Sequence, residues 1–383
     1  MSNTENVETN NDADIDLDHE NETTDASLSA GTIMQSNDDS KDHGVLYLGI
    51  DLGTSRTSVS SSNGVRETVA SYVGYPKDVV SRKLLKKDVL FGDEAAEKRL
   101  SLEFYRPLAD GVIDCNVDDM TDAKGNLKAA RDLIGEIIRR AQPRKDELIY
   151  AVIGVPAQAS IHSKEAIIKA AKETVDSVML CSEPFSVAYG LDMLDDVLVI
   201  DIGAGTTDLC RMHGTMPEDS DQITVTFAGD YVDNQLMERI KEAHPEAQFS
   251  VNMIKAIKEK YSNVADDMPP VIVQLPVKGK PTDFDITDIM RESCKSIVAP
   301  LVEGLGELVA SFDPEFQDRL KNRVLIAGGG SQIRGLDIAV EAYMQEHLGG
   351  GKVIKTEEAM YGGSNGALKI AHDMPGDFWE QLK

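Results

Sequence analysis

The chain has 383 residues, of which 41% are apolar, and its formal net charge is −27. This length allows two to three domains around a sizeable core, and the composition is typical of a soluble globular protein. A charge this negative repels nucleic-acid backbones and anionic membrane surfaces, and no apolar run approaches the roughly 20 residues that span a bilayer. We therefore expect a cytoplasmic protein that neither binds nucleic acid directly nor inserts into a membrane.

Residues 1–44 are the most acidic segment of the chain. They hold twelve aspartate and glutamate side chains against one lysine, Lys41, and no aromatic residue. Such a segment buries too little apolar surface to offset the entropy lost on ordering, so we expect a disordered tail. A solubilising extension is the simplest interpretation. A docking segment for a basic partner and a brake on self-association stay open.

From Val45 onward, apolar and β-branched runs alternate with helical patterns. An antiparallel hairpin around a glycine turn is predicted for residues 44–62. Ser160 is a plausible N-cap, Pro143 would end the helix before it, and Pro184 sits early in a later helix. The predicted elements that follow the hairpin are a helix at 125–141, a strand at 148–156, a helix at 160–175, a strand at 177–181, a helix at 183–194 and a strand at 197–203. This order indicates an α/β protein with a mixed sheet.

The second half of the chain repeats this plan. Its predicted elements are a strand at 222–229, helices at 230–243 and 251–262, a pair of strands within 269–287, and a strand, glycine turn and helix within 324–348. A chain that doubles one supersecondary plan commonly doubles a domain. We therefore expect two similar domains with a cleft between them.

Two segments 150 positions apart carry the same chemical pattern. They read LGIDLGTSRTSV from Leu48 and VIDIGAGTTDL from Val199. In each, a buried strand ends in an aspartate and a glycine turn follows, so that backbone N–H groups can approach an anion without a Cβ in the way. Two such turns across a cleft could hold a polyphosphate, and Asp51 and Asp201 could hold Mg²⁺ through its water shell.

A third glycine-rich turn supports a nucleotide as the ligand. Gly328, Gly329 and Gly330 lie between a predicted strand and a predicted helix, where a flat base or sugar could rest against bare backbone. The chain contains no GxxxxGK[ST] sequence, and neither GAGTTD nor GGGSQI completes GxGxxG. The pattern therefore differs from a Walker P-loop and from a dinucleotide fingerprint.

Together these segments resemble the ATPase superfamily of actin, heat-shock chaperones and sugar kinases. Five blocks occur in the superfamily's order over Val45 to Lys383: LGIDLGTSRTSV, SEPFSVAYG, VIDIGAGTTDL, IAGGGSQIRGL and YGGSNGALKIA. The segments AVIGVPAQASIHSKEAI, FAGDYVDNQL and AIKEKYS are most similar to bacterial actins. VGYPKDVV and GALKIAHDMPGDFWEQL resemble, more narrowly, the actins of magnetotactic bacteria, whose filaments are associated with aligning magnetosomes. The acidic tail departs from the short start expected in that family.

The resemblance implies an actin-like ATPase fold, with two duplicated mixed-sheet domains around a nucleotide cleft and smaller inserted subdomains. The first domain would span 45–190 with an insertion at about 77–107. The second would span 191–360 with an insertion at about 230–290, and residues 361–383 would return to the first domain.

The resemblance also implies a role for each matching residue. The catalytic pair would be Glu183, which orients the attacking water, and Asp201. The metal-linked residues would be Asp51 and Asp201. The phosphate turns would comprise Gly53, Thr54, Ser55, Gly203, Ala204, Gly205, Thr206 and Thr207. The nucleoside side would comprise Gly229 and Asp230 at the ribose, Lys258 and Glu259 at the adenosine, and Gly328, Gly329 and Gly330 as the adenine floor. Ser58 occupies the place of actin's phosphate-loop lysine, so charge neutralisation would fall on Mg²⁺ and backbone amides.

The function expected from this resemblance is a filament-forming ATPase. ATP and Mg²⁺ would be the cofactors, other copies of the chain the main partner, and magnetosome-associated proteins further partners. A bacterial actin for cell shape or plasmid segregation is the first alternative. A chaperone ATPase would need a further peptide-binding domain, and a sugar kinase would need a substrate pocket with a catalytic base and commonly a longer chain.

Overall fold

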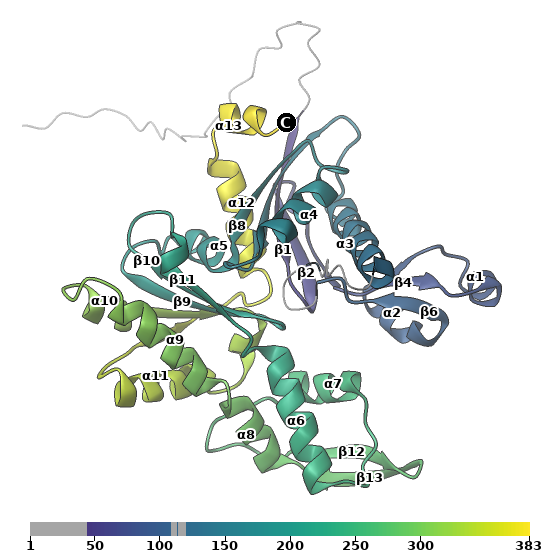
Figure 1. The fold of residues 1–383 in the computed structure, drawn as a ribbon, viewed down its shortest axis with the longest axis vertical. Helices are drawn as coiled ribbons and strands as arrows, with labels where there is room; N and C mark the ends of the chain where they lie inside the picture. Colours follow the sequence, from purple (N-terminus) through teal and green to yellow (C-terminus); the bar gives the residue numbers. More distant parts are fainter. Residues whose placement is uncertain (1–43, 109–112, 114–119) are drawn as a thin grey trace, which may run out of the picture. The chain divides into compact units, whose positions relative to one another are not determined.

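The computed structural model describes residues 44–108, 113 and 120–383, with side chains at 120–123 excepted (Figure 1). The disordered tail predicted for residues 1–44 lies, apart from Gly44, outside the described residues. All the elements below belong to one unit, residues 43–383.

The first sheet is built around a central hairpin. Its strands, in spatial order, are β3 (Arg66–Ala70), β2 (Arg56–Ser61), β1 (Val45–Leu52), β7 (Leu148–Val155) and β8 (Ser177–Ser182). β1 pairs antiparallel with β2, placing Asp51 opposite Ser58, and parallel with β7. The predicted hairpin and mixed sheet are therefore confirmed. Val, Ile and Thr fill these strands because their branched side chains suit a pleated, packed surface.

The second sheet repeats the first strand for strand. Its order is β11 (Gln222–Val225), β10 (Thr207–Met212), β9 (Val197–Ile202), β14 (Val324–Ala327) and β15 (Val353–Lys355). β9 pairs antiparallel with β10 and parallel with β14. Asp51 and Asp201 therefore lie at equivalent ends of two central strands. The predicted α/β class, the mixed sheets and the doubled plan are therefore confirmed.

Helices cover both faces of these sheets. Along β1, Leu46, Leu48 and Ile50 pack toward α3 (Met120–Arg140) and α4 (Ile161–Ala171), because alternate residues of a strand face opposite sides. The other face packs with α5 (Glu183–Gly190), α12 (Gly362–Asp373) and α13 (Gly376–Gln381). Ser160 caps α4, as predicted. Of the helices that the structure describes, none is long and apolar enough to cross a membrane.

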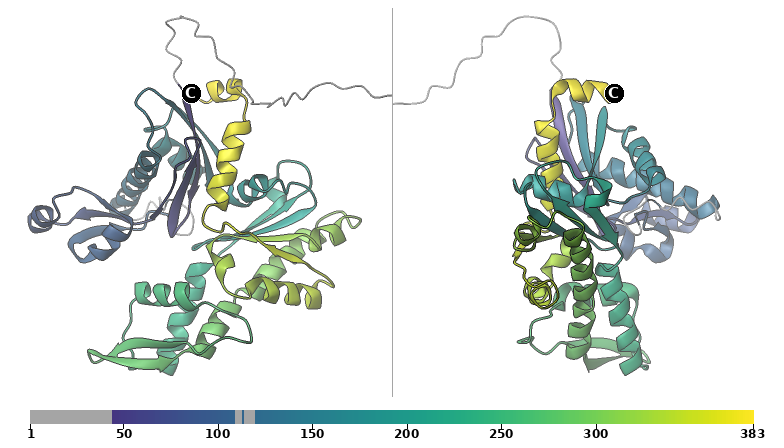
Figure 2. Two further views of the ribbon diagram at one scale, coloured as in Figure 1. Left: turned by 180° about the vertical axis from the view of Figure 1, so that it is seen from behind. Right: turned by 60° about the vertical axis from the view of Figure 1, so that its left-hand side comes forward.

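The second sheet has its own large core. Helices α9 (Val298–Ala310) and α11 (Leu336–His347) pack against it, with the short α10 (Gln317–Lys321) and the 3-10 turn η4 (Gly329–Gln332) nearby. Buried residues of α5 and α12 join a third core that reaches both β7 and β9. One layer of helices therefore connects the two sheets (Figure 2).

Two smaller groups of elements are inserted into this plan. The first has three strands and two helices: β4 (Val73–Pro76), α1 (Val79–Leu85), β5 (Leu90–Phe91), α2 (Gly92–Glu97) and β6 (Leu102–Tyr105). The second consists of α6 (Gly229–Ala243), α7 (Val251–Tyr261), β12 (Ile272–Val277), β13 (Lys280–Asp285) and α8 (Thr287–Lys295). They overlap the insertions expected at about 77–107 and about 230–290. The domain boundaries themselves stay predictions.

Helix α12 approaches β1 and α5 unusually closely. A Cβ at Gly366 would lie 1.8 Å from the carbonyl oxygen of Ser186, and one at Gly49 would lie 2.1 Å from that of Ser364. The Ser186 hydroxyl donates a 2.7 Å hydrogen bond to Gly363. Figure 2 shows α12 running beside the sheet that contains β1. Glycine at these two crossings lets α12 pack closely against both α5 and β1. Through α12, the helix that starts at Glu183 is held near the strand that ends beside Asp51.

Gly366→Ala should lower the free energy of unfolding by about 1–3 kcal/mol or more, because the added methyl group overpacks the crossing of α5 and α12. Urea unfolding followed by circular dichroism measures the change. Gly376→Ala is the matched control, since a Cβ there meets open space. An equal effect of the two substitutions would contradict the close-packing explanation.

Candidate functional site

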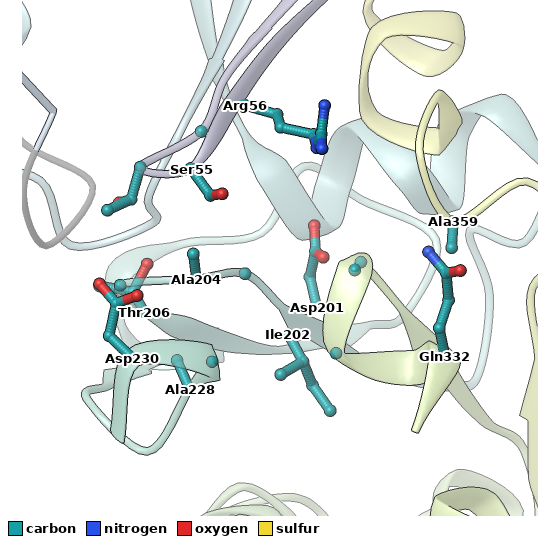
Figure 3. Close-up of a pocket in the computed structure, with 18 of the residues that line it drawn as sticks. Ser55, Arg56, Asp201, Ile202, Ala204, Thr206, Ala228, Asp230, Gln332 and Ala359 are labelled. Carbon is teal, nitrogen blue, oxygen red and sulfur yellow. The ribbon is translucent and has the colours of Figure 1, made fainter. Parts of the chain in front are cut away.

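A cavity of about 520 Å³ lies where the turns of the two sheets face each other (Figure 3). It is lined by the β1–β2 and β9–β10 turns, the start of α5, the start of α6, one face of α7 and η4. Every residue predicted for the site lines this cavity except Thr207. The structure thus brings together positions from 51 to 330 of the sequence, although their individual roles stay predictions.

The two aspartate–glycine turns have the same tight geometry. A Cβ at Gly53 would lie 2.5 Å from the carbonyl oxygen of Arg56, and one at Gly203 would lie 2.9 Å from that of Thr206. The Gly203 N–H donates a 2.9 Å hydrogen bond to Thr206. Each glycine therefore permits a turn that a larger residue would open, and both turns present backbone to the cavity.

Thr207 belongs to the scaffold of its turn. It is fully buried, and its hydroxyl donates a 2.8 Å hydrogen bond to the carbonyl of Phe227. Thr57, at the equivalent place in the first hairpin, is also buried and bonded to Ser71 at 3.1 Å. Thr206 lines the cavity, so the strand's alternation turns the next side chain away from it.

Burial raises the pKa of three cavity carboxylates, and neighbouring negative charges raise the pKa of two of them further. Burial raises the pKa of Asp51 to about 6. Burial, with the nearby charges of Asp51 and Asp208, raises the pKa of Asp201 to about 8. Burial and all three of these aspartates raise the pKa of Glu183 well above its usual range. A site with such shifts favours protons or a cation over bare negative charge.

Asp208 lies behind this group, and sequence reasoning did not select it. It is fully buried, and its carboxylate accepts hydrogen bonds from the Ala157 N–H at 2.9 Å and the Thr224 hydroxyl at 2.5 Å. The first bond joins β10 to the segment after β7, and the second joins β10 to β11. Its place in the GTTD sequence, one residue after Thr207 on a buried strand, was the available signal.

The carboxylates are suited to a hydrated cation. Among the described residues, no three aspartate, glutamate, histidine or cysteine side chains are grouped to bind a metal directly. Magnesium commonly keeps several of its waters and is held by one or two carboxylates, which Asp51 and Asp201 could provide. Their raised pKa values give a physical reason for a cation there, and Mg²⁺ stays a prediction.

The three glycines of the β14–η4 turn have different surroundings. Gly328 has φ +74°, and a Cβ there would lie 2.4 Å from the Oδ1 atom of Asp201. A Cβ at Gly330 would overlap the Ile202 side chain at 2.2 Å, whereas one at Gly329 would meet open space. Gly328 and Gly330 therefore let the turn pack on the end of β9. Gly329 alone leaves bare backbone with free space beside it.

Lys258 has internal partners. Its ammonium group donates a 2.6 Å hydrogen bond to the Gly229 carbonyl and forms a 2.9 Å ion pair with Asp233. These contacts tie α7 to the start of α6. Glu259 lines the cavity beside it.

Two further cations reach the site from elements distant in sequence. Lys255, one turn before Lys258 on α7, donates to the hydroxyl groups of Ser55 and Tyr72. Arg106, just after β6, forms a 2.6 Å ion pair with Asp230 and donates a 3.3 Å hydrogen bond to the Thr54 carbonyl. The i, i+3 spacing to Lys258 could have identified Lys255. The sequence around Arg106 carries no comparable signal.

Comparison with known proteins agrees with this geometry. Residues 46–374 match the model of the MreB/Mbl protein family. The "Actin-like protein MamK" of Paramagnetospirillum magneticum is 41% identical over 340 residues, which are 88% of this chain and 95% of the relative. The solved "MamK double helical filament" is 40% identical with a TM-score of 0.82, covering 87% of this chain and 100% of that one.

A second solved structure, of a non-polymerising MamK mutant bound to AMPPNP, is 40% identical with a TM-score of 0.66. It covers 86% of this chain and 100% of that one. The resemblance to bacterial actins, and among them to the actins of magnetotactic bacteria, is thereby confirmed. The chain belongs to the MreB/Mbl family and has the actin-like fold.

Proposed function

We propose that this protein binds ATP with Mg²⁺ in the cavity and assembles into filaments whose disassembly is coupled to ATP hydrolysis. The observation that carries the proposal is the pair of equivalent aspartate–glycine turns that face one cavity of about 520 Å³. Support comes from similar proteins, since one MamK structure is a filament and another contains the ATP analogue AMPPNP.

The two turns would bind the phosphates through their backbone N–H groups. Gly53 and Gly203 keep the approach free of side chains, and Thr206 lines the cavity beside them. Asp51 and Asp201 would hold the hydrated Mg²⁺, which supplies positive charge against the phosphate oxygens. The open space at Gly329 would accept the nucleoside.

Glu183 would position the water that attacks the terminal phosphate. It is the first residue of α5, lines the cavity and lies close enough to Asp51 and Asp201 for their charges to affect its pKa. An ionised carboxylate accepts a hydrogen bond from water more strongly than the neutral acid does, and it can act as a base. Positive charge brought into the cavity lowers the pKa of Glu183, so its acceptor form would appear when the site is loaded.

The filament would organise magnetosomes into chains in the cytoplasm, with magnetosome-associated proteins as partners. The 41% identity to MamK of Paramagnetospirillum magneticum favours this role over that of a cell-shape or plasmid-segregation actin. Localisation of a fluorescent fusion in the source cell tests it. A filament beside magnetite chains supports the role, and a source cell without such chains contradicts it.

ATP with Mg²⁺ should drive the protein into a sedimentable polymer, because nucleotide binding would favour the assembled conformation. High-speed pelleting, with electron microscopy of the pellet, measures assembly. Asp201→Ala should weaken nucleotide binding and leave the protein in the supernatant. Soluble protein under all nucleotide and salt conditions would refute the proposed function.

Glu183→Gln should slow ATP hydrolysis by about 10²–10⁴-fold, since a positioned acid–base group contributes roughly that factor. Nucleotide affinity should be retained, so filaments should form and persist. Phosphate release and pelleting, measured on the same sample, separate the two effects. Hydrolysis at the parental rate would exclude the water-positioning role.

The affinity for magnesium–ATP should increase from about pH 6 to about pH 8.5. Asp51 and Asp201, with pKa values of about 6 and 8 in the free protein, must release protons to face the cation. Each proton released gives up to about a tenfold increase per pH unit. Calorimetry in buffers of different ionisation enthalpy counts the protons. Asp201→Asn should bind more weakly and lose the increase above about pH 7, and a wild type with no pH dependence would contradict the assignment.

A further inference from the structure

One basic side chain that lines the cavity has no partner among the described residues and no role in the proposed function. The acidic side chains at its wall are Asp51, Glu183, Asp201, Asp230 and Glu259, and the basic ones are Arg56, Lys255 and Lys258. A bound nucleoside triphosphate would add negative charge to a cavity wall that is already acidic. Each lining cation is therefore a candidate for direct contact with the phosphates.

Two of the three cations are engaged within the protein. Lys258 is paired with Asp233 and bonded to Gly229. Lys255 donates to the hydroxyls of Ser55 and Tyr72. Arg56, by contrast, has neither an ion pair nor a side-chain hydrogen bond to any residue that the structure describes, and its side chain is exposed. Its guanidinium group is thus available to a ligand.

Arg56 also has a suitable position. It is the first residue of β2, directly after the turn of Gly53, Thr54 and Ser55. Residues two apart in a strand point to the same side, so Arg56 and Ser58 share a face, and Ser58 is paired across the hairpin with Asp51. Figure 3 shows the Arg56 side chain reaching over the cavity, with the Asp201 carboxylate directed toward the same space.

We propose that the Arg56 guanidinium binds the terminal phosphate of the nucleotide and supplies charge that the neutral Ser58 cannot. This inference rests on the proposed function and adds to it a ligand-binding residue. The planar guanidinium group can donate two parallel hydrogen bonds to phosphate oxygens, a geometry that a lysine ammonium group cannot reproduce. The buried Ser58 hydroxyl, which has no hydrogen-bond partner among the described residues, lies on the same face without a charge of its own.

The test compares two nucleotides in two arginine variants. Calorimetry with Mg²⁺ gives the affinities of the full chain for AMPPNP and for ADP. Arg56→Gln should weaken AMPPNP binding by about 10- to 100-fold, as expected for hydrogen bonds to a charged group, and ADP binding by less than about threefold. Arg56→Lys should recover only part of the loss, because it restores the charge and not the paired donors.

Arg99→Gln is the matched control. Arg99 is an exposed arginine that lines, together with Arg56, a neighbouring cavity of about 260 Å³ and does not line the larger one. The Arg99→Gln substitution removes the same charge outside the larger cavity, so the affinities for AMPPNP and ADP should both stay unchanged. The melting temperatures of the nucleotide-free variants should equal that of the wild type, since neither side chain carries an ion pair to a described residue.

The outcomes separate this inference from the proposed function. A wild type that binds neither nucleotide would refute both. A wild type that binds AMPPNP, with an Arg56→Gln variant that binds it equally well, would overturn the role of Arg56 alone. Equal losses for AMPPNP and ADP, or the same loss in Arg99→Gln, would also overturn it. A loss confined to AMPPNP and to position 56 would establish the contact.

Discussion

The burial of three carboxylates at one cavity is the constraint on which the rest of this structure depends. Asp51 and Asp201 lie at the ends of two central strands, and Glu183 begins a helix beside them, so three acids line one cavity. Burial raises all three pKa values, and the charges of nearby aspartates raise those of Asp201 and Glu183 further. Such an arrangement costs folding free energy and persists only if the scaffold is rigid. The close approach of α12 at Gly49 and Gly366 provides this rigidity beneath the site.

Polar contacts between described residues join the two halves of the site at the cavity. The Arg106–Asp230 ion pair connects the end of the first inserted group with the start of α6 in the second. The hydrogen bond from Lys255 on α7 reaches Ser55 in the turn of the first hairpin. Partly exposed polar contacts of this kind contribute little stability singly. A ligand that contacts both turns could therefore change the relation of the two halves at small cost. This is the property that an assembly switch requires, because a ligand shifts a conformational equilibrium only through differential contacts.

Local sequence predicted the scaffold of the site better than its charge network. Strand ends, their aspartates and the glycine turns are determined by neighbours a few residues away, so both hairpins could be predicted from local sequence. The other lining residues, Glu183, Gly229, Asp230, Lys258 and Glu259, were implied by the family resemblance. Thr207 differed because strand alternation, set by the exact start of β10, decides which of two adjacent threonines faces inward. Arg106 and its partner Asp230 are 124 positions apart, and only the fold brings them together. The internal pairing of Lys258 likewise depends on how α6 packs on α7.

The third glycine turn links the two ends of the proposed ligand. Gly328 lies against the Oδ1 atom of Asp201, and Gly330 against Ile202, so the backbone expected to support the nucleoside is packed on the strand expected to hold the cation. Movement of the β14–η4 turn would be transmitted to the Asp201 carboxylate through this contact, since no side chain lies between them to absorb it. Binding of the base and the position of the Asp201 carboxylate near the phosphates would then both depend on the contact between Gly328 and Asp201. For this reason a side chain at position 328 would disturb both ends of the site together, although Gly328 itself offers the ligand only its backbone.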